Sequence, residues 1–452
     1  MITKHRPNRR LSAVVATWGN FDRSFLLLIT GAVVIIMVLI LMVFVKGPRI
    51  REVTFNPELL TQTSGQWLVL HTNQPLRPVS VKQVSVVPYT PINVLSSGNE
   101  VAIQFEQRLP YETTYTIKLT ATPVKLTYRF TTSVAASYYL ESPGTIKEHI
   151  VGQDVDRTVF QAGFINDFAL SGKYLAVVVQ NGSTDQLRIV NTQTGKSYAA
   201  NLPEAGMISK VHASPDGEDF TFTLTSEDIS EKPYYNTTLF TFNAVTNKSS
   251  LVYGFNRSPI RVTDWTYAPG GSVIVAQTFS SVIEAVYLNG QASPLPLGAY
   301  GIIAGFSSDG SKIYVGTVQR GMEYITIATR KVTLLNQTPL GAGSSLQLVL
   351  PLQNSGGYVM QVQKPLPNSA NLAQYIILVE GGHERILYAS SNGTDAIAGI
   401  SLSPNDQYVS IGLSPTYFTR SNDGTPAGTL TVDVANGKVI DHIPSLEQVL
   451  WQ

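Results

Sequence analysis

Ser214-Pro-Asp-Gly-Glu-Asp-Phe-Thr-Phe-Thr-Leu224 is the stretch that decides the fold of most of this 452-residue chain. It joins a turn, Ser214 to Gly217, to a β-rich strand, Asp219–Leu224. A second turn follows about twenty residues later, at Asn243-Ala-Val-Thr-Asn-Lys248. Gly and Asn suit tight turns because they adopt positive φ at little cost. The stretch therefore predicts a unit made of antiparallel hairpins.

The same pattern recurs at intervals of about 40 to 55 residues. Its first turn begins at Leu170, Ser214, Ala268, Ser307, Asn354 and Ser403, and the strands that follow are Lys173–Val179, Asp219–Leu224, Ser272–Ala276, Lys312–Thr317, Tyr358–Val362 and Gln407–Leu413. The second turn is clearest at Asn191–Lys196, Asn243–Lys248 and Asp433–Lys438. Four strands in roughly 40–50 residues make one blade of a β-propeller. Six units predict a six-bladed β-propeller over residues 140–452, and residues 135–165 leave room for a seventh blade.

The Ser-Pro-Asp-Gly turn with its strand, and the later Asn/Asp-x-x-Thr-Gly-Lys turn, resemble the WD40-like propeller of the Tol envelope protein and its relatives. The resemblance is strongest in the second and sixth units. The Trp-Asp ending of true WD40 repeats is absent, since Asp264-Trp265 is reversed and isolated. This resemblance implies the propeller fold.

Strict alternation of apolar and polar residues marks residues 48–134. It is clearest in Asn99–Glu106, Thr114–Thr120 and Leu126–Thr131. Period two with one polar face is typical of half-buried antiparallel strands. Earlier candidate strands are Ile50–Phe55, Gln66–His71 and Val81–Val87. Six or seven short strands in this length predict a β-sandwich.

The end of this region carries a second resemblance. Leu109-Pro-Tyr-Glu-Thr-Thr-Tyr-Thr-Ile117 and the closing Phe130-Thr-Thr132 look like the bacterial Ig-like domain of surface-layer proteins. That family is structural, so the resemblance implies a spacer or adhesive module without catalytic residues.

Phe25 to Val45 is an uncharged apolar run of 21 residues. A helix of that length matches a hydrocarbon core of about 30 Å, which predicts one transmembrane helix at residues 25–45. The preceding tail, residues 1–24, holds Lys4, Arg6, Arg9, Arg10 and Arg23 against Asp22 alone. The positive-inside rule then places this tail in the cytoplasm and the bulk outside. A cleaved signal peptide is the alternative, but the run is long and ends at Phe44-Val45-Lys46-Gly47-Pro48 without an Ala-x-Ala site.

Composition narrows the partners and the compartment. The chain has no cysteine, which favours a bacterial envelope over a disulfide-rich animal exterior and excludes thiol chemistry. No basic run follows residue 51, so a nucleic-acid partner is not expected.

No reactive motif is evident, and we predict no catalytic residue, no cofactor and no metal. The six histidines lack zinc spacing: His5, His71, His149, His212, His383 and His442. Gly305–Gly310 has the wrong spacing for a nucleophile elbow, and Gly195-Lys196-Ser197 lacks the upstream glycine of a phosphate loop. Asp154-Val-Asp156 and Asp216–Asp219 offer oxygens for calcium but do not continue as EF-hand loops.

These features together predict a single-pass, non-enzymatic membrane protein whose propeller presents a rigid face to a protein or glycan, with the sandwich as spacer. Two alternatives stay open. One is a propeller-fold hydrolase or lyase, whose residues come from separate blades, because fold alone does not exclude chemistry. The other is a subunit of a larger envelope assembly.

Overall fold

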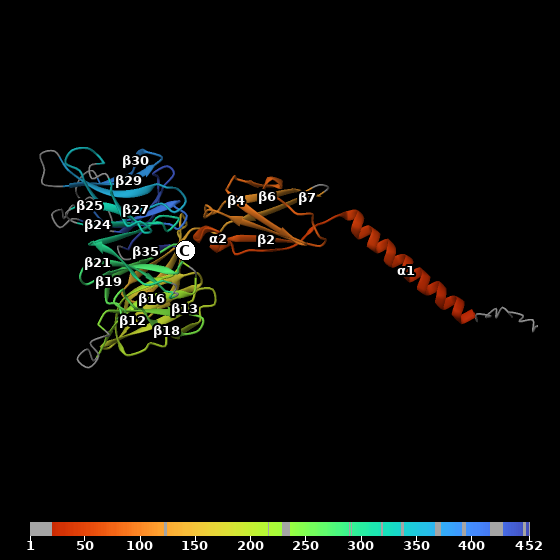
Figure 1. Ribbon diagram of the computed structural model, residues 1–452, viewed down its shortest axis with the longest axis horizontal. Coiled ribbons are helices and arrows are strands. Elements are labelled where there is room, and N and C mark those ends of the chain that lie inside the picture. Colours follow the sequence, from red (N-terminus) through yellow and green to blue (C-terminus); the bar gives the residue numbers. More distant parts are fainter. Residues whose placement is uncertain are drawn as a thin grey trace, which may run out of the picture.

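A long helix and two β-rich bodies follow one another along the computed structural model (Figure 1). The helix is α1, Asn20–Lys46. The structure describes residues 20–121, 124–215, 217–227, 236–288, 290, 292–317, 320–335, 339–366, 372–390, 395–415, 428–445 and 449–451. The predicted tail therefore lies outside the described residues up to residue 19.

The described side chains of α1, residues 24–39, are all exposed, among them Leu27 at 72% and Leu28 at 71%. Neither β-rich body packs against this stretch (Figure 1). In the part of the chain that the structure describes, no helix meets both the length and the apolarity required of a membrane-crossing segment.

The first β-rich body consists of two sheets. One has the order β1-β2-β5-β4 and the other the order β3-β6-β7. The strands are β1 Ile50–Thr54, β2 Trp67–Thr72, β3 Val84–Val87, β4 Ile92–Ser97, β5 Glu100–Phe105, β6 Thr114–Ala121 and β7 Val124–Thr131. Inward residues of both sheets form one core, in which Leu68, Ile103 and Ile117 are almost fully buried. This body is the sandwich, and the alternation in the sequence produces it because successive side chains of a strand face opposite sides.

Two short helical turns interrupt the strands of the sandwich. In α2, Pro57–Gln62, the Asn56 side chain caps the helix by accepting from the backbone N–H of Glu58 at 3.0 Å, and Pro57 suits the first helical position. The other is η1, Val81–Gln83, where the sequence predicted a strand. Gln83 accepts a hydrogen bond from the Ser80 N–H, which closes a local turn that competes with strand pairing.

Seven four-stranded sheets follow residue 135 in the described residues. The first contains β8 Ala136–Ser142, β9 Thr145–Ile150, β10 Asp156–Gln161 and β35 Val449–Trp451; the second β11 Ile165–Ser171, β12 Tyr174–Asn181, β13 Thr184–Asn191 and β14 Ser197–Ala199; the third β15 Gly206–Ala213, β16 Asp219–Ser226, β17 Thr238–Asn243 and β18 Lys248–Leu251; the fourth β19 Val262–Tyr267, β20 Val273–Thr278, β21 Val282–Tyr287 and β22 Leu295–Ala299. The fifth contains β23 Ile302–Phe306, β24 Lys312–Thr317, β25 Gly321–Thr326 and β26 Lys331–Leu334; the sixth β27 Ser345–Pro351, β28 Tyr358–Pro365, β29 Leu372–Glu380 and β30 His383–Ser390; the seventh β31 Asp395–Leu402, β32 Tyr408–Pro415, β33 Gly428–Asp433 and β34 Val439–Ile443. We call this body the propeller-like domain.

The first of these sheets is one more than the six repeat units predict, and it lies where the sequence left room for a seventh. It escapes the repeat count because its fourth strand, β35, comes from the far end of the chain and pairs with β8 at Val449↔Tyr139. β35 also contacts β11 and β31, which belong to the second and seventh sheets.

The hydrophobic cores of the propeller-like domain lie between neighbouring sheets. The cluster that contains Val178 and Ile189 of the second sheet also contains Phe220 and Phe240 of the third. Both faces of a middle strand are therefore covered, and Leu175 to Val178 in β12 are all buried. This explains why the middle strands read as continuous apolar runs, whereas the strands of the sandwich alternate.

The sandwich is joined to the propeller-like domain by a short polar junction. Asn354 Nδ2 donates to the Arg108 carbonyl at 2.9 Å, and its Oδ1 accepts from the Arg108 N–H at 3.1 Å. Asn405 Nδ2 donates to the Leu109 carbonyl at 3.0 Å, and the Tyr111 N–H donates to Gln407 Oε1 at 2.8 Å. One loop of the sandwich, between β5 and β6, thus meets turns of the sixth and seventh sheets.

Stacked aromatic rings reinforce this junction. The Tyr111 ring of the sandwich lies parallel to Tyr408, with centroids 6.0 Å apart and planes at 5°. Trp451 of β35 stacks on the same Tyr408 ring at 5.9 Å. Tyr408 therefore connects the sandwich, the seventh sheet and the strand that completes the first sheet.

Candidate binding site

The propeller-like domain has two faces, and the sandwich occupies one of them. The first strand of each sheet from β11 to β31 ends at a turn, and the turns at Asn354 and Asn405 contact the sandwich. Arg108 of the sandwich lines one pocket together with residues at the ends of β19, β23, β27 and β31, so these ends gather on the side of the sandwich. The starting ends of the same strands lie on the opposite side. We call that side the outer face. Its exposed apolar side chains include Phe164, Met207, Phe255, Phe279 and Ile302.

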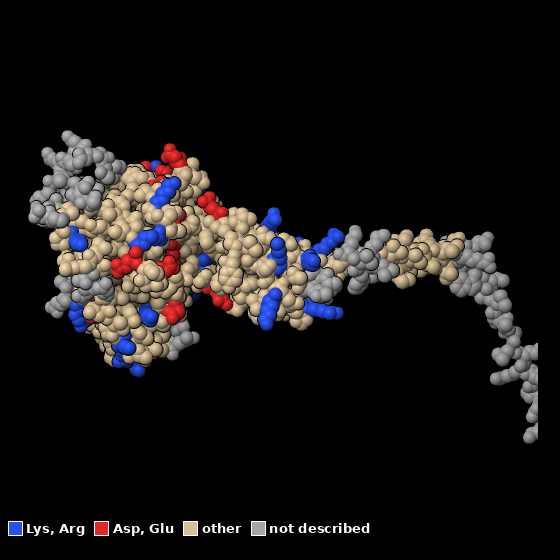
Figure 2. Space-filling view, turned by 90° about the horizontal axis from the view of Figure 1, so that it is seen from above, with Lys and Arg blue, Asp and Glu red and all other residues tan. Residues whose placement is uncertain are grey.

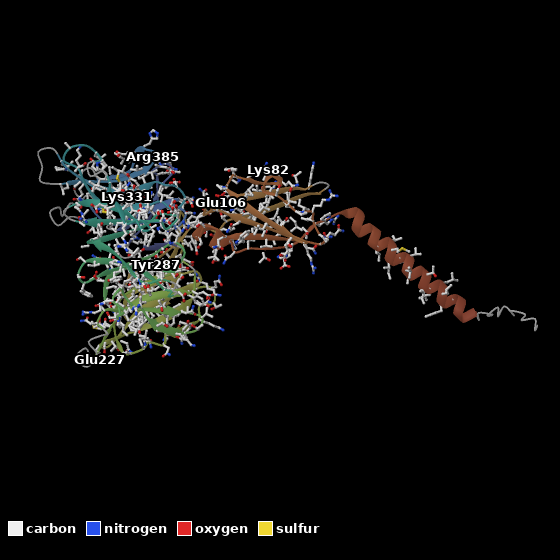
Figure 3. All side chains as sticks on the ribbon, in the orientation of Figure 1. Lys82, Glu106, Glu227, Tyr287, Lys331 and Arg385 are labelled. Carbon is white, nitrogen blue, oxygen red and sulfur yellow. The ribbon has the colours of Figure 1, made fainter. Side chains whose placement is uncertain are left out.

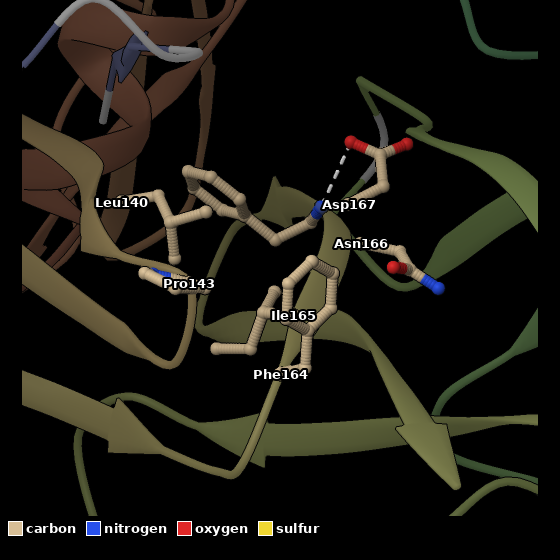
Figure 4. A pocket seen from close by; sticks show the side chains of 7 residues that line it. Leu140, Pro143, Phe164, Ile165, Asn166 and Asp167 are labelled. Atoms are coloured by element: carbon tan, nitrogen blue, oxygen red, sulfur yellow. Dashed lines mark hydrogen bonds between the residues drawn. The ribbon is translucent and has the colours of Figure 1, made fainter. Parts of the chain in front are cut away.

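A pocket of about 380 Å³ lies on the outer face, where β11 begins (Figure 4). Leu140, Pro143, Phe164, Ile165, Asn166, Asp167 and Phe168 line it. Apolar side chains from the first and second sheets form most of its wall, and Asn166 and Asp167 supply the polar groups. A mainly apolar hollow with a few polar groups is the usual form of a recognition site.

The Asp167 carboxylate is bound on both oxygens. Oδ1 accepts from the Phe168 N–H at 2.9 Å, drawn in Figure 4, and Oδ2 accepts from the Val211 N–H at 2.8 Å in the next sheet. Burial raises the pKa of Asp167 to about 6, and the two N–H donors and the Lys210 charge oppose that rise. Asp185 makes an equivalent bond to the Ile208 N–H at 2.7 Å. Both carboxylates thus fasten the second sheet to β15.

A β-bulge near the start of each first strand makes this fastening possible. The register shifts between Ile165 and Asp167 in β11 and between Ile208 and Val211 in β15, and β19, β23, β27 and β31 show the same irregularity. A bulge releases an N–H from the ladder and redirects a side chain. The released N–H of Val211 is the one that binds Asp167.

Two ionisable side chains of β15, Lys210 and His212, contact residues of the fourth sheet. Lys210 Nζ donates to Asp264 Oδ1 at 2.9 Å. His212 packs on Trp265 with ring centroids 4.4 Å apart, and burial lowers the pKa of His212 to about 4. His212 is therefore neutral near pH 7. The carboxylates and the histidine thus take part in contacts between neighbouring sheets.

A second pocket, of about 370 Å³, lies beneath the sandwich, and Arg108, Thr266, Phe306, Gln353 and Ser401 contribute to its lining. Arg108 Nε donates to the Gln62 carbonyl at 2.7 Å, whereas its Nη1 has no hydrogen-bond partner among the described residues. Burial lowers the pKa of Arg108 and raises that of Asp406 to about 6, so burial outweighs the attraction between these two charges.

A third pocket, of about 520 Å³, lies between the third and fourth sheets, with Asp219, Asn243, Lys248 and Gly271 in its lining. In this pocket Asn243 Nδ2 donates a hydrogen bond to Asp219 Oδ1 at 2.7 Å, so these two side chains bind each other.

The residues considered in the sequence occupy structural positions. Gly305 lies in β23, and Gly195 and Lys196 lie in the turn after β13. Asp156 accepts a hydrogen bond from His149, and Asp216 lies outside the described residues. Within the described ranges, no group of three or more His, Cys, Asp or Glu side chains is arranged to hold a metal ion.

One triad-like contact lies on the sandwich. Thr54 Oγ1 is 3.3 Å from His71 Nε2, and His71 Nδ1 is 3.4 Å from Glu100 Oε1. The three residues come from adjacent strands β1, β2 and β5, and none lines a pocket described above. Cross-strand neighbours on an exposed sheet surface explain this contact without catalysis.

No family model matches the chain, and no curated protein matches it. Solved structures do resemble it. A putative TolB from Agrobacterium tumefaciens aligns with 56% of this chain and 88% of its own length, at 13% identity and a TM-score of 0.36. One of two prolyl endopeptidases aligns with 74% of this chain at 13% identity and a TM-score of 0.50, and the tricorn protease aligns with 89% at 9% identity and a TM-score of 0.47.

The chain spans about half the length of these two peptidase structures, 48% and 49% respectively. At such low identity the likeness concerns the fold alone. Together with the run of four-stranded sheets, it supports a β-propeller-type fold, and the mostly-β prediction is confirmed.

Proposed function

We propose that this chain is a membrane-anchored extracytoplasmic binding protein whose propeller-like domain presents its outer face to a protein partner. In this proposal the seven sheets close into a ring through β35, the Ig-like sandwich acts as a spacer, and α1 is an uncleaved signal anchor with its N-terminus in the cytoplasm.

The main support for a protein partner is the set of exposed side chains on the outer face. The opposite face is occupied by the sandwich, so a partner of the propeller-like domain has the outer face and the rim available. The outer face exposes separate aromatic and aliphatic side chains, with Phe255 and Phe279 both 57% exposed. The Arg261 guanidinium lies 5.3 Å from the centre of the Phe279 ring. Aromatic residues beside arginine are enriched where proteins bind proteins.

The anchor is supported by the apolar run Phe25–Val45 and by the exposed apolar side chains of α1. Water would solvate that surface poorly, and a bilayer would cover it. A reporter fused after residue 452 should be active only outside the cytoplasm. Activity in the cytoplasm would reverse the proposed orientation.

A crosslinking experiment tests the outer face. A photo-crosslinking amino acid is placed at Phe279 in the full-length protein in cells, with Asn201, on the side of the sandwich, as the matched control position. We expect one discrete crosslinked species from position 279 and none from position 201. The species should be lost when Phe255→Asp is added. Equal crosslinking from both positions would contradict the assignment, and binding to a glycan array instead would assign the face to a glycan.

A further inference from the structure

The end of the sandwich that adjoins α1 is rich in basic side chains (Figure 2). It carries Arg49, Arg51, Arg77, Lys82, Lys118 and Lys125, all exposed, and we call this set the basic end. Only Glu52 and Glu100 stand among them as acids, and Glu100 contacts His71 at 3.4 Å. The remaining acids of the sandwich, Glu58, Glu106 and Glu112, lie toward the propeller-like domain, as Figure 3 shows for Glu106.

Strand pairing places these residues at one end. β6 starts at Thr114, near the junction, and runs away from it to Ala121. Lys125, which pairs with Thr120, therefore lies at the far end, and Lys118 lies just past the middle of the strand. Val84 pairs with Leu119, which brings Lys82 to the same end. The Leu76 N–H donates to the Gly98 carbonyl at 2.9 Å, which places Arg77 beside the β4–β5 turn.

None of the six basic side chains forms an ion pair with a described residue. Elsewhere on the chain some cations have acidic partners: Lys147 pairs with Glu141, and Arg157 pairs with Glu148. The basic end thus carries an excess of positive charge, with six basic side chains against Glu52 and Glu100.

Its distance from α1 is short. Arg49 follows the last helical residue, Lys46, by three positions, which span at most about 11 Å. Charges act over a Debye length of about 8–10 Å at physiological salt. Lysines on the propeller-like domain, such as Lys331, lie at least a sandwich length further away, about 26 Å for an eight-residue strand. Only the basic end lies close enough to interact with a surface at the end of α1.

We propose that the basic end docks on the anionic phospholipid headgroups of the bilayer that holds α1, and so fixes the tilt of the sandwich and of the propeller-like domain above it. This inference rests on the membrane anchor of the proposed function. Lys and Arg side chains next to a membrane segment bind anionic headgroups by this attraction.

The absence of cysteine makes a specific test simple. Ser97→Cys, at the exposed end of β4 beside the β4–β5 turn, is labelled with a fluorescence donor in the full-length protein. The labelled protein is reconstituted into nanodiscs that carry an acceptor on a lipid headgroup. The nanodiscs contain phosphatidylcholine alone or an equal mixture with phosphatidylglycerol. We expect energy transfer to be higher in the anionic nanodiscs and to fall to the phosphatidylcholine level at high salt. A second label at Ser280→Cys, on the outer face, reports the distance of the propeller-like domain.

Matched charge reversals distinguish the basic end from net charge. Lys82→Glu, Lys118→Glu and Lys125→Glu together should abolish the lipid-dependent rise in transfer. Lys196→Glu, Lys331→Glu and Lys438→Glu change the net charge equally at exposed positions of the propeller-like domain and should preserve the rise. All six substitutions are on the surface, so melting temperatures should match the parent.

Each other outcome overturns the inference. Equal transfer in the two lipids, with normal reconstitution, would contradict the docking and leave the anchor intact. Failure of the chain to enter nanodiscs would contradict both the anchor and the docking. A response of Ser97 to soluble polyphosphate in phosphatidylcholine nanodiscs, without any response to phosphatidylglycerol, would assign the surface to an anionic polymer.

Discussion

Two contacts of the propeller-like domain differ in their chemistry: its junction with the sandwich, and the contact between its own first and seventh sheets. The junction with the sandwich consists of neutral amide hydrogen bonds and stacked rings around Asn354 and Tyr408. The contact between the first and seventh sheets includes the His149 imidazole, which lies between Asp156 of its own sheet and Asp441 of the seventh sheet. His149 Nδ1 lies 2.8 Å from Asp156 Oδ1, and Nε2 lies 2.6 Å from Asp441 Oδ2.

This difference predicts different responses to pH. An imidazole donates to two carboxylates only when it is protonated. The hydrogen bond to Asp441 raises the pKa of His149, burial opposes the rise, and the bond to Asp156 adds to it. Burial alone would raise the pKa of Asp441, but the bonds from His149 and from the Gly152 N–H bring it below its usual value. Amides do not titrate, but Asp406 accepts a hydrogen bond from the Asn354 N–H at 2.6 Å, and burial raises the pKa of Asp406 to about 6. The junction should therefore be insensitive to pH only where Asp406 is ionised, above about pH 7.

Tyr408→Ala should have the largest effect, because Tyr408 is buried and stacks on Tyr111 and Trp451. Truncation of a buried aromatic side chain costs about 3–5 kcal/mol. We expect that loss in the free energy of unfolding, measured with urea. Tyr89→Ala is the control, since Tyr89 is 88% exposed. Similar losses in the two variants would contradict the connecting role of Tyr408.

His149→Gln should cost about 2–3 kcal/mol near pH 6, since it removes hydrogen bonds to charged groups at a buried position. The folded-state pKa of His149 is raised above the unfolded value of about 6.5. Its contribution is therefore complete below pH ~6.5 and is lost as pH rises through the folded-state pKa. The difference between wild type and variant should shrink with rising pH. His383→Gln is an exposed control, and a difference that grew with pH would exclude the protonated form.

Asn354→Ala should cost about 1–2 kcal/mol, because the amide donates to Arg108 and Asn405 and accepts from Arg108. We expect the same loss at pH 7.5 and pH 9, where the neighbouring Asp406 is ionised throughout. The exposed Asn201→Ala is the control. A marked pH dependence of the Asn354 effect would remove the contrast between the two contacts.

Lys210→Gln should have the smallest effect. Its ion pair with Asp264 is 43% and 38% exposed, and pairs of this kind contribute about 1 kcal/mol or less. Urea unfolding at low and high salt measures the contribution, which salt should reduce. If Lys210→Gln lowered the free energy of unfolding as much as His149→Gln does, then solvent exposure would not explain the difference in strength between these two ion pairs.

Local patterns in the sequence predicted much of the fold. The alternation at Asn99–Glu106 and Thr114–Thr120 matches β5 and β6, and the turn at Ser214 precedes β16 as expected. The prediction of a strand at residues 81–83 was wrong, because hydrogen bonds between Ser80 and Gln83 favour a 3₁₀ turn there.

Long-range contacts were not predictable from the sequence in this way. The pairing of Trp451 with Ser137 joins segments with no shared motif. The same holds for His149, whose partner Asp441 is 292 positions away, and for Arg108 and Asn354. The pocket at Asp167 was also missed. The sequence did contain one signal for this pocket, because the acidic residue Asp167 stands two positions after Ile165, where an apolar strand begins. The direction of the Asp167 side chain, however, depends on a β-bulge that forms only when β11 pairs with β12.

The pairing of β35 with β8 also dictates an order of folding. During translation the sandwich and most of the sheets can form in the order of the sequence. One edge of β8 stays unpaired until β35, more than 300 residues later, has been synthesised. An exposed strand edge is a site for mispairing with another chain. Synthesis of β35, rather than collapse of any single sheet, should therefore time the completion of the first sheet, and chains interrupted before β35 should aggregate through β8.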